Sequence, residues 1–291
     1  MDELMLFHNH ASYKLNDSVS ISQPTLLDIE KIGYEQYQNY LSILTSNVYD
    51  IADILWFEMK IWYEDIGDEW QFFMQKYAES KQSVILYNGK KYSYGVRVAK
   101  DLTDALNFFF AQNCEYAFIV DEETQSVVLG TIEVSKEKLL HKLVNKFKKR
   151  RIQTIYQPCG FYLDADAYKK LSEFLKTINW INKDYMFLHG GTRRAKIYIL
   201  QQINRERNKP ISKSNVTLTS IISSLIAKGL GYKDIWDMPI YMVYDQYYRH
   251  MKIDEWNNTM GALHSGCLDT KKHPIRWEKI NWSSVIQKWL I

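Results

Sequence analysis

The chain has few cysteines, with only Cys114, Cys159 and Cys267 among its 291 residues. They are far apart, odd in number and form no CxxC pair, which argues against a disulfide framework and against a structural zinc site. We therefore expect the protein to work in a reducing compartment.

Long apolar runs are also lacking. No stretch of about 18 apolar residues occurs, and the opening residues, MDELMLFHNHASYKL, are acidic from the second position. We therefore expect neither a signal peptide nor a membrane span, and we expect a cytosolic protein.

An excess of one charge is absent too, because 37 basic residues face 34 acidic ones, for a net charge of +3. Such a balance gives no global attraction to nucleic acid, so any polyanion site must be a local cluster. The aromatic content is high by contrast, with 21 Tyr, 9 Trp and 12 Phe beside 12 Gly and 5 Pro. Because Tyr and Trp suit half-wet contact surfaces as well as cores, this composition favours an interaction protein.

Catalytic signatures are missing as well. The seven histidines form neither HxxxH nor HExxH, and no serine lies in a nucleophile-elbow pattern. Asp164 and Asp166 could suggest a magnesium pair, yet an Asp before a helical pattern is usually a cap. The sequence predicts no catalytic residue, no metal site and no cofactor, and therefore no enzyme.

Two basic groups could hold an anion. The first consists of Lys146, Lys148, Lys149, Arg150 and Arg151. These side chains could contact the phosphates of a polyanion. The favoured interpretation is a solvated helix end, whose cations oppose the negative end of the helix dipole.

The second basic group, GGTRRAK, contains Gly190, Gly191, Arg193, Arg194 and Lys196. Two glycines before a helix can leave N–H groups free for an anion. The group lacks the spacing and the Lys-Ser/Thr ending of a P-loop, so a structural turn is the favoured interpretation.

The hydrophobic pattern predicts an α+β fold that is mainly helical. Helical N-terminal (1–80) and C-terminal (191–291) portions flank an α+β middle domain (81–190). The N-terminal portion predicts a helix over 22–44, with Pro24 in its first position and Ser22 or Gln23 at its cap. A second helix is capped by Asn47, with an apolar stripe that runs to Trp62, and a third covers 68–78.

The middle domain begins with a β-hairpin, because Asn88-Gly89 separates two runs of β-branched and aromatic residues. The further elements expected in this domain are a helix over 102–112, strands from 116 and 126, and helices over 135–151 and 165–180. Helices resume over 192–207 and from 215 onward.

One C-terminal segment, DIWDMPIYMVYDQYYRHMKIDEW at 234–256, combines helical spacing with many aromatic residues. Because proline is tolerated only in a first helical turn, Pro239 makes Asp237 the expected cap. A core helix is the favoured interpretation of the segment. The alternative is a face that docks a partner through Trp236, Tyr241, Tyr244 and Tyr248.

The stretch ISQPTLLDIEKIGYEQYQNYLSILTSNVYDI and the later stretches AKIYILQQINRERNKPISKSN, LTSIISSLIAKG, IWDMPIYMVYDQYYR and GALHSGCLDTKK share a pattern with known proteins. They resemble a family from tailed phages of low-GC Gram-positive bacteria. The resemblance covers about the first 65 and the last 100 residues and leaves the middle domain unaligned.

This resemblance implies a non-enzymatic factor of tail morphogenesis, either an assembly chaperone or a tail or baseplate component of the virion. It implies tube, tape-measure or baseplate proteins as partners, leaves a homo-oligomer open, and places the protein in the host cytoplasm or the virion tail. Neither nucleic acid nor a membrane is an expected partner. The N-terminal helix is expected to pack against the C-terminal helices.

Two other functions stay open. The first is a phage effector that binds a host defence or nucleic-acid-processing protein and touches nucleic acid through Lys146 to Arg151, since the middle domain has no assigned tail role. A nuclease that uses Asp164, Asp166 and basic residues is the least favoured.

Overall fold

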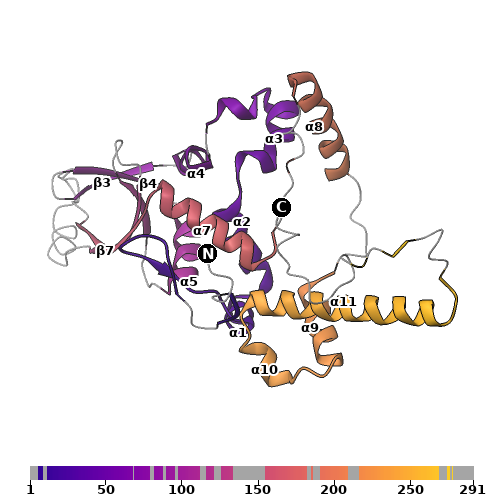
Figure 1. Ribbon diagram of the computed structural model, residues 1–291. Coiled ribbons are helices and arrows are strands. Elements are labelled where there is room, and N and C mark those ends of the chain that lie inside the picture. Colours follow the sequence, from indigo (N-terminus) through magenta and orange to yellow (C-terminus); the bar gives the residue numbers. More distant parts are fainter. Residues whose placement is uncertain are drawn as a thin grey trace.

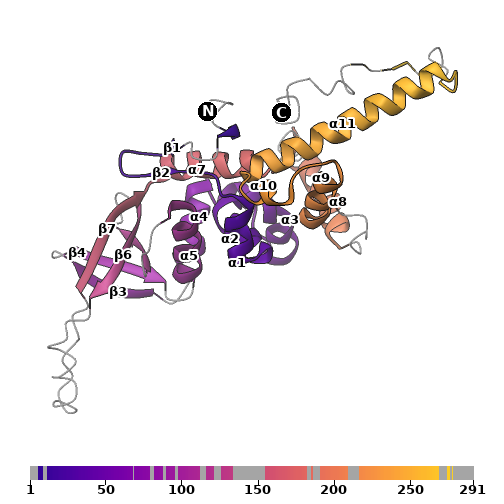
Figure 2. The ribbon, with the colours of Figure 1, turned by 90° about the horizontal axis from the view of Figure 1, so that it is seen from below.

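The computed structural model shows a mainly helical α+β protein, as predicted (Figure 1). A five-stranded sheet lies at one end of the molecule, and helices make up most of the rest (Figures 1 and 2). The structure describes residues 6–8, 12–67, 69–78, 82–87, 90–95, 98–111, 116–120, 126–133, 155–181, 185, 191–208, 216–268, 274–275 and 277.

The N-terminal portion begins with the paired strands β1 (Tyr13–Lys14) and β2 (Ser20–Ile21), followed by the helices α1 (Leu26–Ile32) and α2 (Tyr34–Thr45). The expectation of one helix that begins at Pro24 is wrong. Thr25 is the N-cap, because its hydroxyl accepts a hydrogen bond from the Asp28 N–H while the Asp28 carboxylate accepts one from the Thr25 N–H. Gly33 then interrupts the helix with φ 86° and ψ 142°, a conformation nearly restricted to glycine.

Replacing Gly33 by alanine should lower the free energy of unfolding by about 1 to 2 kcal/mol. A Cβ at this position would meet no atom within 4 Å, so the loss comes from the backbone conformation alone. Gly261→Ala is the matched control, because Gly261 lies inside a helix with equal space around it, where alanine should stabilise by about 1 kcal/mol. Urea unfolding measures both variants, and equal effects would contradict the role given to Gly33.

The segment after α2 is capped by Asn47, as predicted, since its side chain accepts from the Tyr49 N–H at 2.9 Å. Short pieces follow instead of one helix: η2 (Val48–Ile51), α3 (Ala52–Ile54) and the π-helical η3 (Leu55–Met59). Lys60 ends them with φ 61°, so the expected extension of the helix to Trp62 is wrong. Past this turn Trp62 is buried against Tyr63, at 4.7 Å between ring centroids. Next come η4 (Tyr63–Asp65) and α4 (Glu69–Ala78), of which α4 confirms the third predicted helix.

The middle of the chain forms an antiparallel sheet in the order β3-β4-β5-β6-β7. Its strands are β3 (Gln82–Tyr87), β4 (Lys90–Gly95), β5 (Tyr116–Val120), β6 (Ser126–Glu133) and β7 (Ile155–Leu163). Tyr87 pairs with Lys90, which confirms the predicted hairpin. Helix α5 (Val98–Phe110) lies between the sheet and α2 (Figure 1). The helix expected over 135–151 lies outside the described residues.

The remaining helices are α7 (Ala165–Ile178), α8 (Arg193–Arg207), α9 (Leu218–Ala227), α10 (Tyr232–Trp236) and α11 (Ile240–His264). Asp164 caps α7, as predicted, by accepting from the Ala167 N–H at 2.8 Å. The segment 234–256 is not one helix and Asp237 is not its N-cap, because Asp237 ends α10 and Pro239 precedes α11 as its N-cap. Proline lacks an N–H and clashes with a preceding helical turn, so α10 cannot continue into α11.

One buried cluster joins the two ends of the chain. It contains residues of α1, α10 and α11, and the backbones meet through the Leu26 N–H to the Met238 carbonyl and the Ile240 N–H to the Pro24 carbonyl, both at 3.1 Å. In the structure the N-terminal helix α1 therefore packs against α10 and α11. Residues of α5 and α7 belong to the same cluster. The domain boundaries at 80 and 190 stay a prediction. No helix in the described part of the chain is long and apolar enough to cross a membrane.

Candidate partner-binding surface

The four side chains predicted to contact a partner lie near the base of α11, where this helix joins the body of the protein. Trp236, at the end of α10, is half-buried and packs against the main core. Tyr241 is 6% exposed, while Tyr244 and Tyr248 are half-buried. Burial raises the pKa of the Tyr244 phenol above its usual value of 10.0.

The three tyrosines surround Trp180, which follows the end of α7. The centroid of the Trp180 ring lies 6.3 Å from Tyr241, 6.2 Å from Tyr244 and 5.5 Å from Tyr248. Aromatic pairs at these distances contribute beyond their buried area. The cluster therefore fastens α11 to α7, in agreement with the core interpretation of this segment, and a partner contact by these side chains stays a prediction.

The outer half of α11 differs from its base. Beyond Tyr247 none of the described residues of this helix belongs to the buried cluster that joins the chain ends, or to a second buried cluster formed around Tyr63 and Leu200. Figure 2 shows the helix projecting from the body. The apolar residues of this half are spaced by three, four and three positions along one face, and each is half-buried: Ile253, Trp256, Met260 and Leu263. We call these four residues the outer stripe.

A charged contact near the start of the outer stripe joins α11 to the end of α9. Lys228, at the end of α9, donates to both carboxylate oxygens of Asp254 at 2.6 Å. Within α11 itself, the buried Asp245 accepts from Arg249 Nε at 2.8 Å, one turn further along the helix. Trp256 contacts the ring of Trp277, at 5.5 Å between centroids. The stripe is therefore presented on a helix whose orientation is already set.

The GGTRRAK group has a structural role. The Arg193 guanidinium lies 5.4 Å from the ring centroid of Trp56 and 4.8 Å from that of Trp62. Lys196 pairs with Glu64 at 2.5 Å. Because these contacts join the start of α8 to the segment before α4, the interpretation as a structural element agrees with the structure. The residues that Arg193 and Lys196 contact lie about 130 positions earlier in the sequence; Lys196 and Glu64, for example, are 132 positions apart. Residue spacing therefore could not reveal these contacts.

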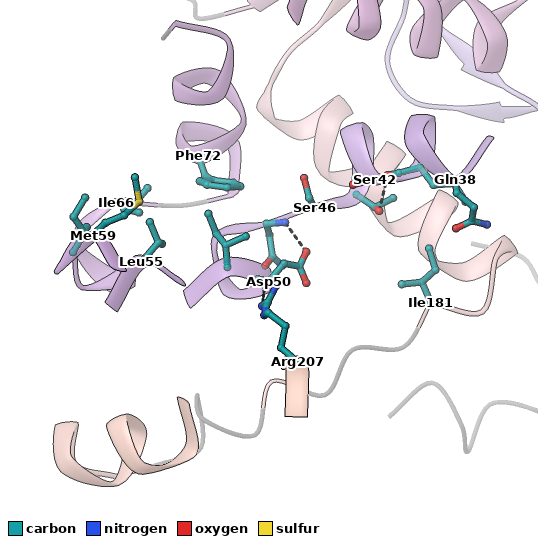
Figure 3. A pocket seen from close by; sticks show the side chains of 15 residues that line it. Gln38, Ser42, Ser46, Asp50, Leu55, Met59, Ile66, Phe72, Ile181 and Arg207 are labelled. Carbon is teal, nitrogen blue, oxygen red and sulfur yellow. Dashed lines mark hydrogen bonds between the residues drawn. The ribbon is translucent and has the colours of Figure 1, made fainter. Parts of the chain in front are cut away.

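A pocket of about 820 Å³ opens between α2, η2, η3, α4 and the end of α8 (Figure 3). Apolar side chains such as Leu55 and Phe72 line it together with Asp50 and Arg207. The Asp50 carboxylate accepts from the Asn47 N–H at 3.0 Å and from the Tyr185 hydroxyl at 2.9 Å. Since its charged groups hold neighbouring elements together, we assign the pocket no chemistry.

The acidic pair Asp164 and Asp166 and the basic run near residue 150 are the remaining candidates from the sequence. Asp164 is a cap and Asp166 is an exposed residue of the first turn of α7. Within the described ranges no three His, Cys, Asp or Glu side chains gather as metal ligands would. The predicted polyanion contact, formed by Lys146, Lys148, Lys149, Arg150 and Arg151, lies outside the described residues.

Fold and surface together define an α+β protein that presents an apolar stripe on a projecting helix. A family model described as YomV second domain matches residues 208–287, a region that includes α9, α10 and α11. YomV is a phage-derived Bacillus protein family, so the match indicates a phage origin. No curated protein and no solved structure matches the chain.

Proposed function

We propose that this chain is a non-enzymatic phage protein that acts in the morphogenesis of the tail or baseplate by holding another tail protein on the outer stripe of α11. The observation that carries the proposal is the stripe itself, an apolar face outside both buried clusters. It lies in the region matched by the phage-derived family model. The assignment to the tail comes from the resemblance of both ends of the chain to proteins of tailed phages.

The chemistry of the stripe favours a helical partner. Apolar residues at alternating spacings of three and four form the seam by which two helices pack side by side. Trp256 is an aromatic residue near the middle of the stripe, as energetic anchors of interfaces often are. Because α11 is already fixed at its base, little conformational entropy is lost when a partner binds.

Trp256→Ala should weaken the complex with the tail partner about 30-fold, because an aromatic anchor contributes about 2 kcal/mol. Asn258→Ala is the matched control, since Asn258 is exposed on the opposite side of the same helix. Co-expression with the tube, tape-measure and baseplate proteins identifies the partner, and calorimetry gives the affinities. Circular dichroism checks that both variants are folded.

Several outcomes would count against the proposal. Association with none of the tail proteins would contradict it, and so would a folded Trp256→Ala variant that binds as tightly as the wild type. Recovery of a host protein in place of a tail protein would favour the phage effector. Peptide mass spectrometry then separates the two tail roles, because a virion component is found in purified particles and a chaperone only in the lysate.

A further inference from the structure

Basic charge is concentrated on helix α8. Its sequence, RRAKIYILQQINRER, contains five basic residues and one acidic residue. The helix therefore carries a formal charge of +4, a local concentration of basic residues in a chain whose net charge is +3.

Three of the five cations are used to dock the helix on the body. Arg193 and Lys196 hold its start, as described above, and Arg207 holds its end by donating to the two carboxylate oxygens of Asp53 at 2.7 and 2.9 Å. The buried Leu200 lies on the same docked side. These contacts at both ends fix the rotation of α8 about its axis.

The opposite face of α8 points outward. Four residues make up this face. At 100° per residue, they lie within about 60° of arc around the helix axis, on the side away from Leu200. They are all exposed: Arg194, Tyr198, Gln201 and Arg205. Tyr198 is 63% exposed, and neither arginine forms an ion pair with any residue that the structure describes. Figure 1 shows α8 at the periphery of the molecule.

We propose that this outward face of α8 binds single-stranded nucleic acid, with Arg194 and Arg205 on backbone phosphates and Tyr198 stacked on a base. The two arginines are eleven positions apart in the helix, which places them about 16 Å apart along the axis, a distance that spans several nucleotides.

Arginine suits this role because its planar guanidinium donates two parallel hydrogen bonds to a phosphate. An exposed tyrosine between two cations is the combination by which non-specific single-strand binders hold bases, since every base has a face on which a ring can stack. An acidic protein would pair with the arginines but would give Tyr198 no such role. The inference does not depend on the outer stripe of α11, so the two proposals can fail separately.

The test uses the full chain and a fluorescently labelled oligo-dT of about 20 nucleotides, with anisotropy measured between about 50 and 200 mM salt. The double variant Arg194→Gln/Arg205→Gln should weaken binding about tenfold and reduce the slope of log affinity against log salt by about 1.4, because two phosphate contacts are lost. The matched control, Lys169→Gln/Lys233→Gln, removes the same charge from other exposed positions and should change the affinity less than about twofold.

Tyr198 is tested by two further variants. Tyr198→Ala should weaken oligo-dT binding at least about fivefold, whereas Tyr198→Phe should bind as the wild type because the ring is kept. A duplex of equal length should bind more weakly, since its bases are already stacked.

The proposal is overturned if the wild type does not bind oligo-dT at low salt, or if the arginine variant and the lysine control lose affinity equally. Equal binding of duplex and single strand, together with full binding by Tyr198→Ala, would also overturn it, because stacking would then have no part. All variants affect exposed side chains, and circular dichroism confirms that they are folded.

Discussion

Arg207→Ala should lower the free energy of unfolding by about 3 kcal/mol and release the end of α8. Its partner Asp53 is 1% exposed, and its carboxylate receives two parallel hydrogen bonds from the guanidinium. Arg207 also donates to the Asp50 carbonyl at 2.8 Å. Without the arginine, a buried carboxylate is left without its counter-charge, which costs about 3 to 5 kcal/mol. We expect the lower end of this range, since the Arg207 side chain is 42% exposed and water can replace part of the contact.

Arg205→Ala is the control for this prediction, because it removes the same side chain from the same helix at an exposed position without an ion pair in the described structure. It should change the free energy of unfolding by less than about 0.5 kcal/mol. Arg207→Lys keeps the charge but loses the planar guanidinium that donates two parallel hydrogen bonds, so the stability of this variant should lie between those of Arg207→Ala and Arg205→Ala. Urea unfolding measures all three, and equal stability of the two alanine variants would show that the Asp53 pair contributes little.

The local elements of this fold could be predicted because their causes lie within a few residues. Asn47 and Asp164 cap their helices by accepting from an N–H two or three positions further on, and such caps are visible in the sequence. The hairpin between β3 and β4 follows from Asn88-Gly89 in the same way. The break at Gly33 could not be predicted from the apolar spacing, because this spacing continues across Gly33 and only the backbone angles reveal the break.

The contacts that assemble the elements could not be predicted, since they join distant residues. Arg207 and Asp53 are 154 positions apart, and the Tyr37 hydroxyl donates to the Asn179 side chain across 142 positions. The outer stripe is a different case. Met260 and Leu263 continue the spacing of Ile253 and Trp256 in the sequence, but the predicted segment ends at Trp256, the last aromatic residue of the run.

The stability of the protein should fall steeply as the pH rises above about 10, because its core buries tyrosines, among them Tyr37 and Tyr168. Tyr37 is 0% exposed and Tyr168 is 1% exposed. Burial raises the pKa of both phenols above the usual value of 10.0, since the phenolate form is poorly solvated in the core. The Tyr37 hydroxyl also donates to the Asn179 side-chain oxygen at 2.7 Å, a hydrogen bond that only the protonated phenol can make.

The sign of the effect follows from comparing the two states. Below pH 10 both phenols are protonated in the folded and the unfolded chain, so they add no pH dependence. Above pH 10 the unfolded chain releases these protons while the folded chain keeps them, which favours unfolding. Each phenol then contributes a loss of about 1.4 kcal/mol per pH unit, and the two together about 3 kcal/mol per unit.

Two substitutions distinguish the tyrosines. Tyr168→Phe removes one titrating group. Above about pH 10, the free energy of unfolding of this variant should therefore decrease by about 1.4 kcal/mol less per pH unit than that of the wild type. Tyr37→Phe should reduce the slope equally but also destabilise the protein at neutral pH by about 1 to 2 kcal/mol, because the buried Asn179 oxygen loses its donor. Urea unfolding across the pH range gives the slopes, and phenolate absorbance shows when the tyrosines ionise. If both variants kept the wild-type slope, the alkaline loss would have to come from other groups, and burial of these phenols would not limit the stability of the fold.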